Sequence, residues 1–321
     1  MRLRLVPQDT NWDFMQWRRF TFGASVLAML ASIAIWLMVG LNFGIDFLGG
    51  TTIRTESSQS VDVGAYRDAI APLGLGDVTI TEVFDPTFEE GRNVAQIRIQ
   101  AQEGAEAVTP ETIAAVEAAL QTVDPTITFP SVESVGPKVS GELITTALLA
   151  VSASLVAILF YIWLRFEWQF SVGAIAALIH DVVLTIGIFS LFQIRFDLAT
   201  IAAILTIIGY SINDTVVIFD RLRENLIKYK KTPLIDVMNR SVNETLSRTI
   251  MTSGTTLLAL LALLILGGDV IRGFVFAIFW GVLVGTYSSV YVAKNVVLML
   301  GIDRDPKKPS DAGTQFADVD A

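Results

Sequence analysis

Six long runs of apolar residues limit what this chain can fold into. They cover residues 20–40, 143–164, 170–192, 198–219, 249–266 and 274–300. A helix rises about 1.5 Å per residue, so roughly 20 apolar residues cross the hydrocarbon layer of a bilayer, which is about 30 Å thick. Over the whole chain 52% of the residues are hydrophobic and the mean hydropathy is +0.56, which is high for a soluble domain. The sequence therefore predicts a multi-pass α-helical membrane protein with six spans.

The runs divide the chain into four predicted parts. These are an N-terminal segment with the first span at 1–41, a polar domain at 42–141, a five-helix membrane bundle at 142–302 and a polar tail at 303–321. The first run is too long for the apolar core of a signal peptide, and no small-x-small cleavage site follows it, so we expect it to stay as a span. We expect the polar tail to be disordered.

Basic residues gather on one side of the predicted spans, and this predicts the orientation. They precede the first span and follow the fourth and the sixth: Arg18, Arg19, Arg221, Arg223, Lys228, Lys230, Lys231, Arg304, Lys307 and Lys308. By the positive-inside rule, both termini are expected in the cytoplasm and the polar domain outside the cell membrane. Between residues 44 and 141, fifteen acidic residues stand against five basic ones. A basic surface for nucleic acid is therefore not expected.

The polar domain at 42–141 has the pattern strand, helix, strand, strand, helix, strand. Residues 78–84 and 93–99 alternate apolar and polar side chains, as strands do, and Thr109 followed by proline is typical of a helix start. The remaining elements are expected at 51–55, 61–73 and 127–135. This order predicts a ferredoxin-like α+β unit. Its scattered acidic residues are typical of a solvated surface, although an exposed sheet edge that binds an unfolded polypeptide is also compatible with the pattern.

The composition excludes several kinds of chemistry. The chain has no cysteine and a single histidine, His180, so disulfides, thiolate metal sites and multi-histidine metal centres are not expected. It also lacks the G-x-x-x-x-G-K-[ST] phosphate-binding loop. We therefore expect no enzymatic activity, no metal and no cofactor, and we expect an ion gradient to be the energy source.

Asp214 is the first of three ionisable positions that lie in or beside the spans. It ends the fourth apolar run, next to Asn213 and one turn after Gly209. A charged residue in the middle of a span costs about 2.5–3.5 kcal/mol, so it needs a reason. Asp214 is either an interfacial residue paired with a nearby base, or a buried carboxylate that exchanges a proton, with Asn213 as its neutral hydrogen-bond partner. Gly209 leaves room for a neighbouring helix to approach.

Arg248 opens the fifth span and precedes a row of hydroxyl groups. Thr249, Thr252 and Thr256 lie at helical spacing and form a polar stripe, which is expected to face the bundle or a wet cavity rather than lipid. Arg248 itself fits two interpretations. It is either a flanking residue that extends toward the cytoplasm, or a partner of Asp214 that holds the carboxylate ionised when close and lets it bind a proton when it withdraws.

His180 and Asp181 form the third position, in the middle of the third span. Neighbouring residues on a helix point about 100° apart, so we expect each side chain to need its own partner. The pair is either structural, hydrogen-bonded between helices, or part of a proton relay, because imidazole titrates near physiological pH.

Four segments, in this order, resemble the SecF family, the smaller subunit of the SecD–SecF membrane complex. They are G-I-D-F-L-G-G at 44–50, V-G-P-K-V-S-G-E at 135–142, G-Y-S-I-N-D-T-V-V-I-F-D-R at 209–221 and S-R-T-I-M-T-S-G-T-T at 247–256. The resemblance covers nearly the whole chain. It implies half of an RND-type transporter, which pairs with SecD to give twelve spans in two pseudo-symmetric halves.

The resemblance also implies a function and a location. A SecF-like subunit would use the proton-motive force, with SecD, to assist unfolded preproteins through the SecYEG channel of the bacterial inner membrane, with residues 42–141 in the periplasm. Asp214 and Arg248 match family positions linked to proton movement, and SecD would supply a further membrane aspartate. Two alternatives stay open: an RND-like exporter that works as a homodimer, and a passive scaffold of the translocon.

Overall fold

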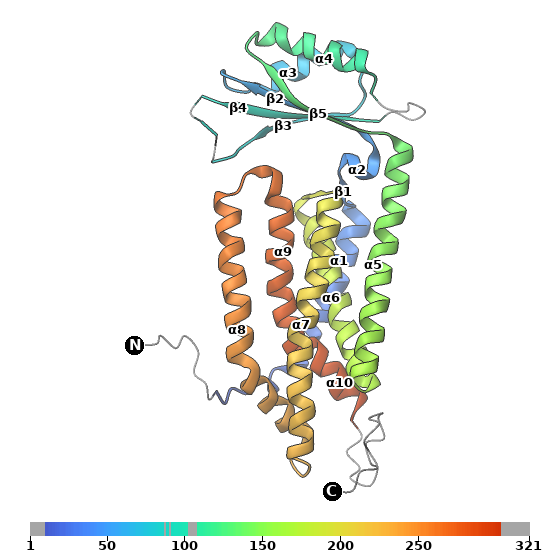
Figure 1. Cartoon of the computed structure of the whole chain (residues 1–321), viewed down its shortest axis with the longest axis vertical. Coiled ribbons are helices and arrows are strands. Elements are labelled where there is room, and N and C mark those ends of the chain that lie inside the picture. Colours follow the sequence, from blue (N-terminus) through green and yellow to red (C-terminus); the bar gives the residue numbers. More distant parts are fainter. Residues whose placement is uncertain (1–9, 87, 90, 102–107, 303–321) are drawn as a thin grey trace, which may run out of the picture.

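The structure is a computed structural model of the chain, and it describes residues 10–86, 88–89, 91–101 and 108–302. Two parts are visible in Figure 1: an upright bundle of helices, and a sheet with two helices on its outer face that sits over one end of the bundle. We call that end the sheet end and the opposite end the far end. The predicted tail at 303–321 lies outside the described residues.

Six helices of the described chain are long and apolar enough to cross a membrane, which confirms the predicted six spans. They are α1 (Arg18–Val39), α5 (Pro137–Arg165), α6 (Trp168–Phe192), α7 (Leu198–Lys228), α8 (Leu234–Leu266) and α9 (Asp269–Ser288), the last continued by the π-helical turn η2 (Ser289–Ala293) and by α10 (Lys294–Leu300). Helices α7 and α8 extend past their apolar runs at the far end. Hydropathy marks only the part of a helix that lies in hydrocarbon, so these polar extensions were not expected from it.

Helices α6, α7 and α9 pack at the centre of the bundle, and α1 lies against α6. Close packing of α7 and α9 depends on two glycines of α9. A Cβ atom added at Gly281 would lie 2.2 Å from Ile207 Cγ1, and one at Gly285 would lie 3.2 Å from Ser211 Cβ. The G-x-x-x-G spacing therefore lets the two helices approach more closely than larger side chains would permit.

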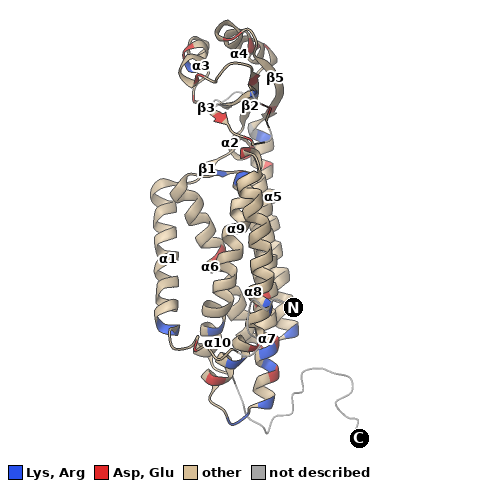
Figure 2. Cartoon of the chain, turned by 90° about the vertical axis from the view of Figure 1, so that its left-hand side faces the viewer, with Lys and Arg blue, Asp and Glu red and all other residues tan. Residues whose placement is uncertain are grey.

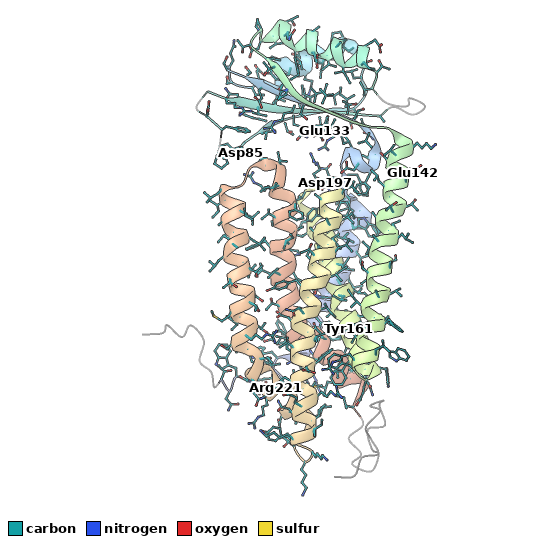
Figure 3. All side chains as sticks on the ribbon, in the orientation of Figure 1. Asp85, Glu133, Glu142, Tyr161, Asp197 and Arg221 are labelled. Carbon is teal, nitrogen blue, oxygen red and sulfur yellow. The ribbon has the colours of Figure 1, made fainter. Side chains whose placement is uncertain are left out.

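Lys and Arg residues concentrate at the far end of the bundle, at the lower ends of the helices in Figure 2. Arg221, labelled there in Figure 3, binds Glu244 of α8 at 2.7 Å. Arg240 binds the same carboxylate at 2.9 Å, and Arg165 of α5 binds Asp220 at 2.9 Å. Such exposed pairs each contribute about 0–1 kcal/mol, so they fix the arrangement of α5, α7 and α8 more than they stabilise it.

The segment before α1 is held against α8 by two asparagines. Asn243 accepts a hydrogen bond from the Trp12 N–H at 2.8 Å and donates one to the Trp12 carbonyl at 2.9 Å. Asn239 accepts from the Phe14 N–H at 2.9 Å. The amide side chains thus satisfy backbone groups that belong to no helix or strand.

The sheet domain contains four antiparallel strands in the order β3-β4-β2-β5. Its elements are β2 (Gly50–Ser57), α3 (Val63–Ile70), the 3-10 turn η1 (Ala71–Leu73), β3 (Val78–Val83), β4 (Asn93–Gln100), α4 (Pro110–Val123) and β5 (Thr128–Val135). Helices α3 and α4 cover the face away from the bundle. Counted within the domain, the strand order is that of the ferredoxin-like unit, so this prediction is confirmed.

The core of the sheet domain follows from the alternation along its strands. Ile53 of β2 and Ile97 of β4 point to the helices and meet Val116 and Leu120 of α4, and all four are buried. The helix begins where the sequence predicted, because the Thr109 side chain accepts from the Thr112 N–H and caps α4.

The segment at 44–50 connects the two parts. Before it, β1 (Asn42–Phe43) pairs in parallel with β6 (Arg195–Phe196), and the short helix α2 (Ile45–Leu48) follows. Asp46 accepts a hydrogen bond from the Leu198 N–H at 3.0 Å. A residue far away in the sequence therefore helps to cap the start of α7. Gly50 has φ +133°, and a Cβ atom there would lie 2.3 Å from the Ile99 carbonyl oxygen, so only glycine fits where the chain enters β2.

A second contact joins the sheet domain to the bundle at the start of α9. Asp269 accepts from the Phe84 N–H at 2.7 Å, and its own N–H donates to the Phe84 carbonyl at 3.2 Å. Figure 3 labels Asp85 at this place, and Glu133 on the sheet above Asp197. The domain therefore contacts the bundle both through the segment at 44–50 and through the loop after β3.

Candidate functional site

Asp214 lies inside the bundle on α7, and only 4% of its surface is exposed. Its carboxylate faces α8, where the Ser253 hydroxyl lies 3.4 Å from Oδ2. The fourth span thus carries a buried carboxylate, as one of the two sequence interpretations expected.

Ser253 joins three helices around this carboxylate. Its hydroxyl lies 2.7 Å from Thr286 Oγ1 of α9 and accepts from the Tyr210 hydroxyl of α7 at 3.3 Å. Thr286 can also donate to the Val282 carbonyl at 2.8 Å. A hydroxyl can both donate and accept. Ser253 can therefore donate to an ionised Asp214, or accept from a protonated one while it donates to Thr286.

Arg248 does not bind Asp214 in this structure. Helices α7 and α8 do pack together, yet within the described residues Arg248 takes part in no ion pair of 4.0 Å or less. The arginine is exposed on α8 and remains near enough to act on the carboxylate through space. The ion pair between Arg248 and Asp214 that one interpretation expected is therefore not formed in this structure.

The Asn213 side chain is not the hydrogen-bond partner of the Asp214 carboxylate. It points away from the bundle and is exposed, as are Gly209 and Thr206 earlier on the same face of α7. Ser253, rather than Asn213, is the neutral hydrogen-bonding neighbour of the carboxylate. Adjacent helical residues point about 100° apart, which is why one is buried and the other is not.

The threonines of the predicted stripe lie at different depths. Thr249 is buried, and its hydroxyl has no hydrogen-bond partner among the described residues. Thr252 and Thr256 are half-buried and donate to carbonyls of their own helix, at Arg248 and Thr252 respectively. Among the described residues, none of the three forms a hydrogen bond with Asp214. The stripe therefore runs along the edge of the helix packing, beside Ser253.

His180 and Asp181 are bound to each other, which corrects the expectation that they need separate partners. His180 Nδ1 lies 2.9 Å from Asp181 Oδ1, and both side chains are buried. Rotation about χ1 and χ2 can bring the imidazole and the carboxylate together, although the two Cβ atoms point about 100° apart. The carboxylate also accepts from the hydroxyls of Ser211 on α7 and Ser288 on α9, so the pair is hydrogen-bonded between helices.

The sequence interpretation missed Ser211 and Ser288, and it did not connect Ser253, one of the hydroxyls after Arg248, with Asp214. Ser211, Ser253 and Ser288 lie in apolar helices, where hydroxyls usually bond a carbonyl of their own helix and give no signal. It also missed Lys294, which is fully buried, with no hydrogen-bond partner for its ammonium group among the described residues. Charge within an apolar run is the signal that could have identified Lys294.

Comparison with known proteins identifies relatives along the whole chain. Residues 115–303 match the family described as "Protein export membrane protein SecD/SecF, C-terminal", and residues 35–61 match the "SecD/SecF GG Motif". The chain is 68% identical to "Protein translocase subunit SecF" of Cereibacter sphaeroides, over 100% of this chain and 99% of the relative. It is 64% identical to the protein of the same name from Rhodobacter capsulatus, over 97% and 96% of the two chains.

A solved structure shares the fold. The crystal structure of SecDF from Thermus thermophilus, titled a translocon-associated membrane protein, matches with a TM-score of 0.82 and 37% identity over 94% of this chain. The chain spans 40% of the length of that SecDF chain. The glycine-containing match at 35–61 includes Gly50, whose positive φ and close approach to β4 only glycine permits.

Proposed function

Because this chain belongs to the SecF family of protein translocase subunits, we propose that it works with a SecD subunit to assist export of unfolded preproteins through the SecYEG channel, and that the proton-motive force drives it. Its relatives are named as translocase subunits, which supports a transport role rather than an enzymatic one. The energy source, the channel and the preprotein are part of the proposal.

One observation carries the proton part of this proposal: Asp214 is buried where α7, α8 and α9 meet, beside hydroxyls that fit either of its charge states. Without a proton, the carboxylate accepts from Ser253. With a proton, it can donate to Ser253, which then donates to Thr286 at 2.7 Å. One elementary charge that crosses 100 mV supplies about 2.3 kcal/mol, enough to shift a two-state equilibrium roughly fiftyfold. Proton binding here can therefore change how three helices pack.

A face of α7 and α8 supports the proposed partner. Asn213 and Arg248 are exposed on this face, next to the small residue Gly209, which has open space above it. Arginine in contact with lipid is costly, and small residues permit close approach of another helix. We propose that SecD covers this face and provides a carboxylate for Arg248.

We also propose the orientation. The basic groups at the far end in Figure 2 support a cytoplasmic far end, under the positive-inside rule. Both termini would then be cytoplasmic in the bacterial inner membrane, and the sheet domain would be periplasmic.

The experiment that tests the function is export of a preprotein into inverted membrane vesicles at fixed SecA and ATP, with and without a proton gradient. Asp214→Asn is expected to abolish the gradient-dependent part while SecD still copurifies, because the amide keeps the shape and loses the charge. Asp220→Asn, at an exposed ion pair on the same helix, serves as the matched control and should export normally. Gradient-dependent export that survives in Asp214→Asn would support the passive scaffold instead, and a chain that copurifies only with itself would support the homodimeric exporter.

A further inference from the structure

A second ionisable centre lies in the interior of the bundle. His180 and Asp181 are at the middle of α6 and are 0% and 1% exposed, respectively. The imidazole bonds to one oxygen of the Asp181 carboxylate. The other oxygen accepts hydrogen bonds from the Ser211 hydroxyl at 2.6 Å and from the Ser288 hydroxyl at 2.9 Å. Gly285 of α9 borders this group, since a Cβ atom there would be in ordinary van der Waals contact with Asp181 Oδ2, at 3.5 Å. Three helices therefore enclose one carboxylate and one imidazole.

The hydrogen bonds favour an ionised Asp181. An ionised carboxylate carries no hydrogen of its own, so it can accept from the imidazole and from both serine hydroxyls at once. The remaining question is the charge on His180, whose Nε2 is buried without a hydrogen-bond partner among the described residues. If Nε2 carries a proton, its N–H has no acceptor. If it does not, a net negative charge is buried. Neither state satisfies every group, so the hydrogen bonds alone do not fix a proton on Nε2 or keep one off it.

In the part of the chain that the structure describes, no Lys or Arg lies within 4.0 Å of the Asp181 carboxylate. The ring of Tyr287 stacks on the imidazole with 6.1 Å between centroids, and its hydroxyl bonds to Ser25 and the Thr21 carbonyl of α1. Among the described residues, α7 and α9 contribute the Ser211 and Ser288 hydroxyls to the centre, and the imidazole of His180 is the titratable group bonded to Asp181. Asp214, three residues after Ser211, faces α8 instead.

We propose that His180 and Asp181 together form a second, interior proton-binding site. The proton binds to Nε2 of the neutral imidazole, and the resulting imidazolium stays bound through Nδ1–H to the ionised Asp181. Only one N–H bond forms or breaks, and the pair gains or loses one positive charge as a unit. The inference extends the proposed proton coupling, but proton binding at this centre does not require that function.

The interior site is connected to Asp214 by shared helices. On α7, Ser211 bonds to Asp181 of the interior site, and Asp214 lies one turn later. On α9, Thr286 faces Ser253 and Ser288 faces Asp181. The π-helical turn Ser289–Ala293 follows directly, and such turns often occur at functional positions. A shift of α9 against α7 therefore changes both sites, and each should sense the charge of the other.

His180 is the only histidine of the chain, so a 15N-histidine label reports this site alone. We would record solid-state 15N NMR of the full-length chain in lipid bilayers between pH 5 and 9, without SecD and without a gradient. The wild type is expected to show one imidazole that titrates between a neutral form with the proton on Nδ1 and an imidazolium. An imidazole that keeps one form over the whole range would overturn the proposal.

Two substitutions should move the titration midpoint in opposite directions. Asp181→Asn is expected to lower it by at least about one pH unit, because the opposite charge is lost. Ser288→Ala is expected to raise it by about 0.5 pH unit, because a donor that stabilises the ionised carboxylate is removed. Thr185→Val is the matched control, since that buried hydroxyl bonds only the Asp181 backbone carbonyl, and its midpoint should equal that of the wild type. Should Asp181→Asn not fold, a midpoint unchanged in Ser288→Ala would overturn the proposal by itself.

The same spectra separate this inference from the proposed function. Asp214→Asn should shift the His180 midpoint if the sites are coupled through α7 and α9, and an unchanged midpoint would refute the coupling. A titrating His180 combined with gradient-dependent export in Asp214→Asn would keep the interior site and refute the proposed function. A His180 that does not titrate, combined with loss of gradient-dependent export in Asp214→Asn, would keep the proposed function and refute the interior site.

Discussion

Asp214 of α7 and Ser253 of α8 face each other inside the bundle, with 3.4 Å between the carboxylate Oδ2 and the hydroxyl Oγ. Arg248, earlier on α8, forms no ion pair with that carboxylate in the part of the chain that the structure describes. The partner of the buried charge is therefore a hydroxyl that can reverse its hydrogen bond, while the arginine stays outside on the face proposed for SecD.

The hydroxyl of Ser253 should matter for proton transfer. Ser253→Ala is expected to slow gradient-dependent export about fivefold, which corresponds to the loss of one hydrogen bond worth about 1 kcal/mol. The measurement is the rate of preprotein import into inverted vesicles. Thr255→Ala is the matched control, because that exposed hydroxyl bonds carbonyls of its own helix, at Met251 and Thr252. Equal rates for the two variants would show that Ser253 has no part in the mechanism.

Arg248 and Asp214 should act as one unit. Arg248→Lys is expected to be partly defective, because a compact ammonium does not form the two-pronged contact that a guanidinium makes with a carboxylate. The double variant Asp214→Asn with Arg248→Met should export no worse than either single variant. Additive losses in this double-mutant cycle would mean that the residues work independently.

The proposed orientation can be tested with single cysteines, because the natural chain has none. Ser58→Cys in the sheet domain should react with an impermeant maleimide from the periplasmic side, and Thr232→Cys between α7 and α8 from the cytoplasmic side. Both would be labelled in intact spheroplasts and in inverted vesicles. If Ser58→Cys reacts only from the cytoplasm, the topology is inverted.

The sheet domain should fold without the bundle. Its core is formed by its own elements, with Ile53, Ile97, Val116 and Leu120 among the buried residues. A fragment of residues 50–136 is expected to be soluble and to unfold cooperatively in urea, as single domains do. Circular dichroism typical of a disordered chain would contradict this, and would leave 42–141 as a segment that needs the membrane part.

Stability of the sheet domain should fall in acid because of Asp124. The Ser57 hydroxyl, followed by the Thr126 hydroxyl and N–H, donates to this carboxylate and holds its pKa below the ordinary value. Asp124 is depressed in the folded state, so its contribution is complete above the unfolded pKa of about 3.9. It is lost as pH falls below that value and through the lowered folded pKa.

Hydrogen exchange of β2 and α4 in the full-length chain, between pH 7 and pH 3, measures this effect. Asp124→Asn is expected to be less protected at pH 7 by about 2 kcal/mol and to show a weaker decline in acid than the wild type. Asp68→Asn on the exposed side of α3 is the control and should behave as the wild type. Identical pH profiles for Asp124→Asn and the wild type would exclude Asp124 as the cause.

The sequence by itself determined the membrane class, the six spans and the ferredoxin-like order of the sheet domain. These features depend on local patterns: runs of about 20 apolar residues, alternation along strands and a capped helix start at Thr109. It also pointed to Asp214, Arg248, His180 and Asp181, because charge in an apolar helix is costly and therefore visible.

Only the tertiary structure decided which of these residues meet. Ser253, rather than Asn213, lies beside Asp214, and His180 and Asp181 bind each other together with Ser211 and Ser288. Burying a hydroxyl in an apolar helix costs little free energy, since it can bond a carbonyl of its own turn. Its presence in the sequence therefore does not reveal which neighbouring helix it will contact. That arrival depends on contacts such as those at Gly281 and Gly285, where α7 and α9 close together, and distances between helices are not encoded in the spacing along any one of them.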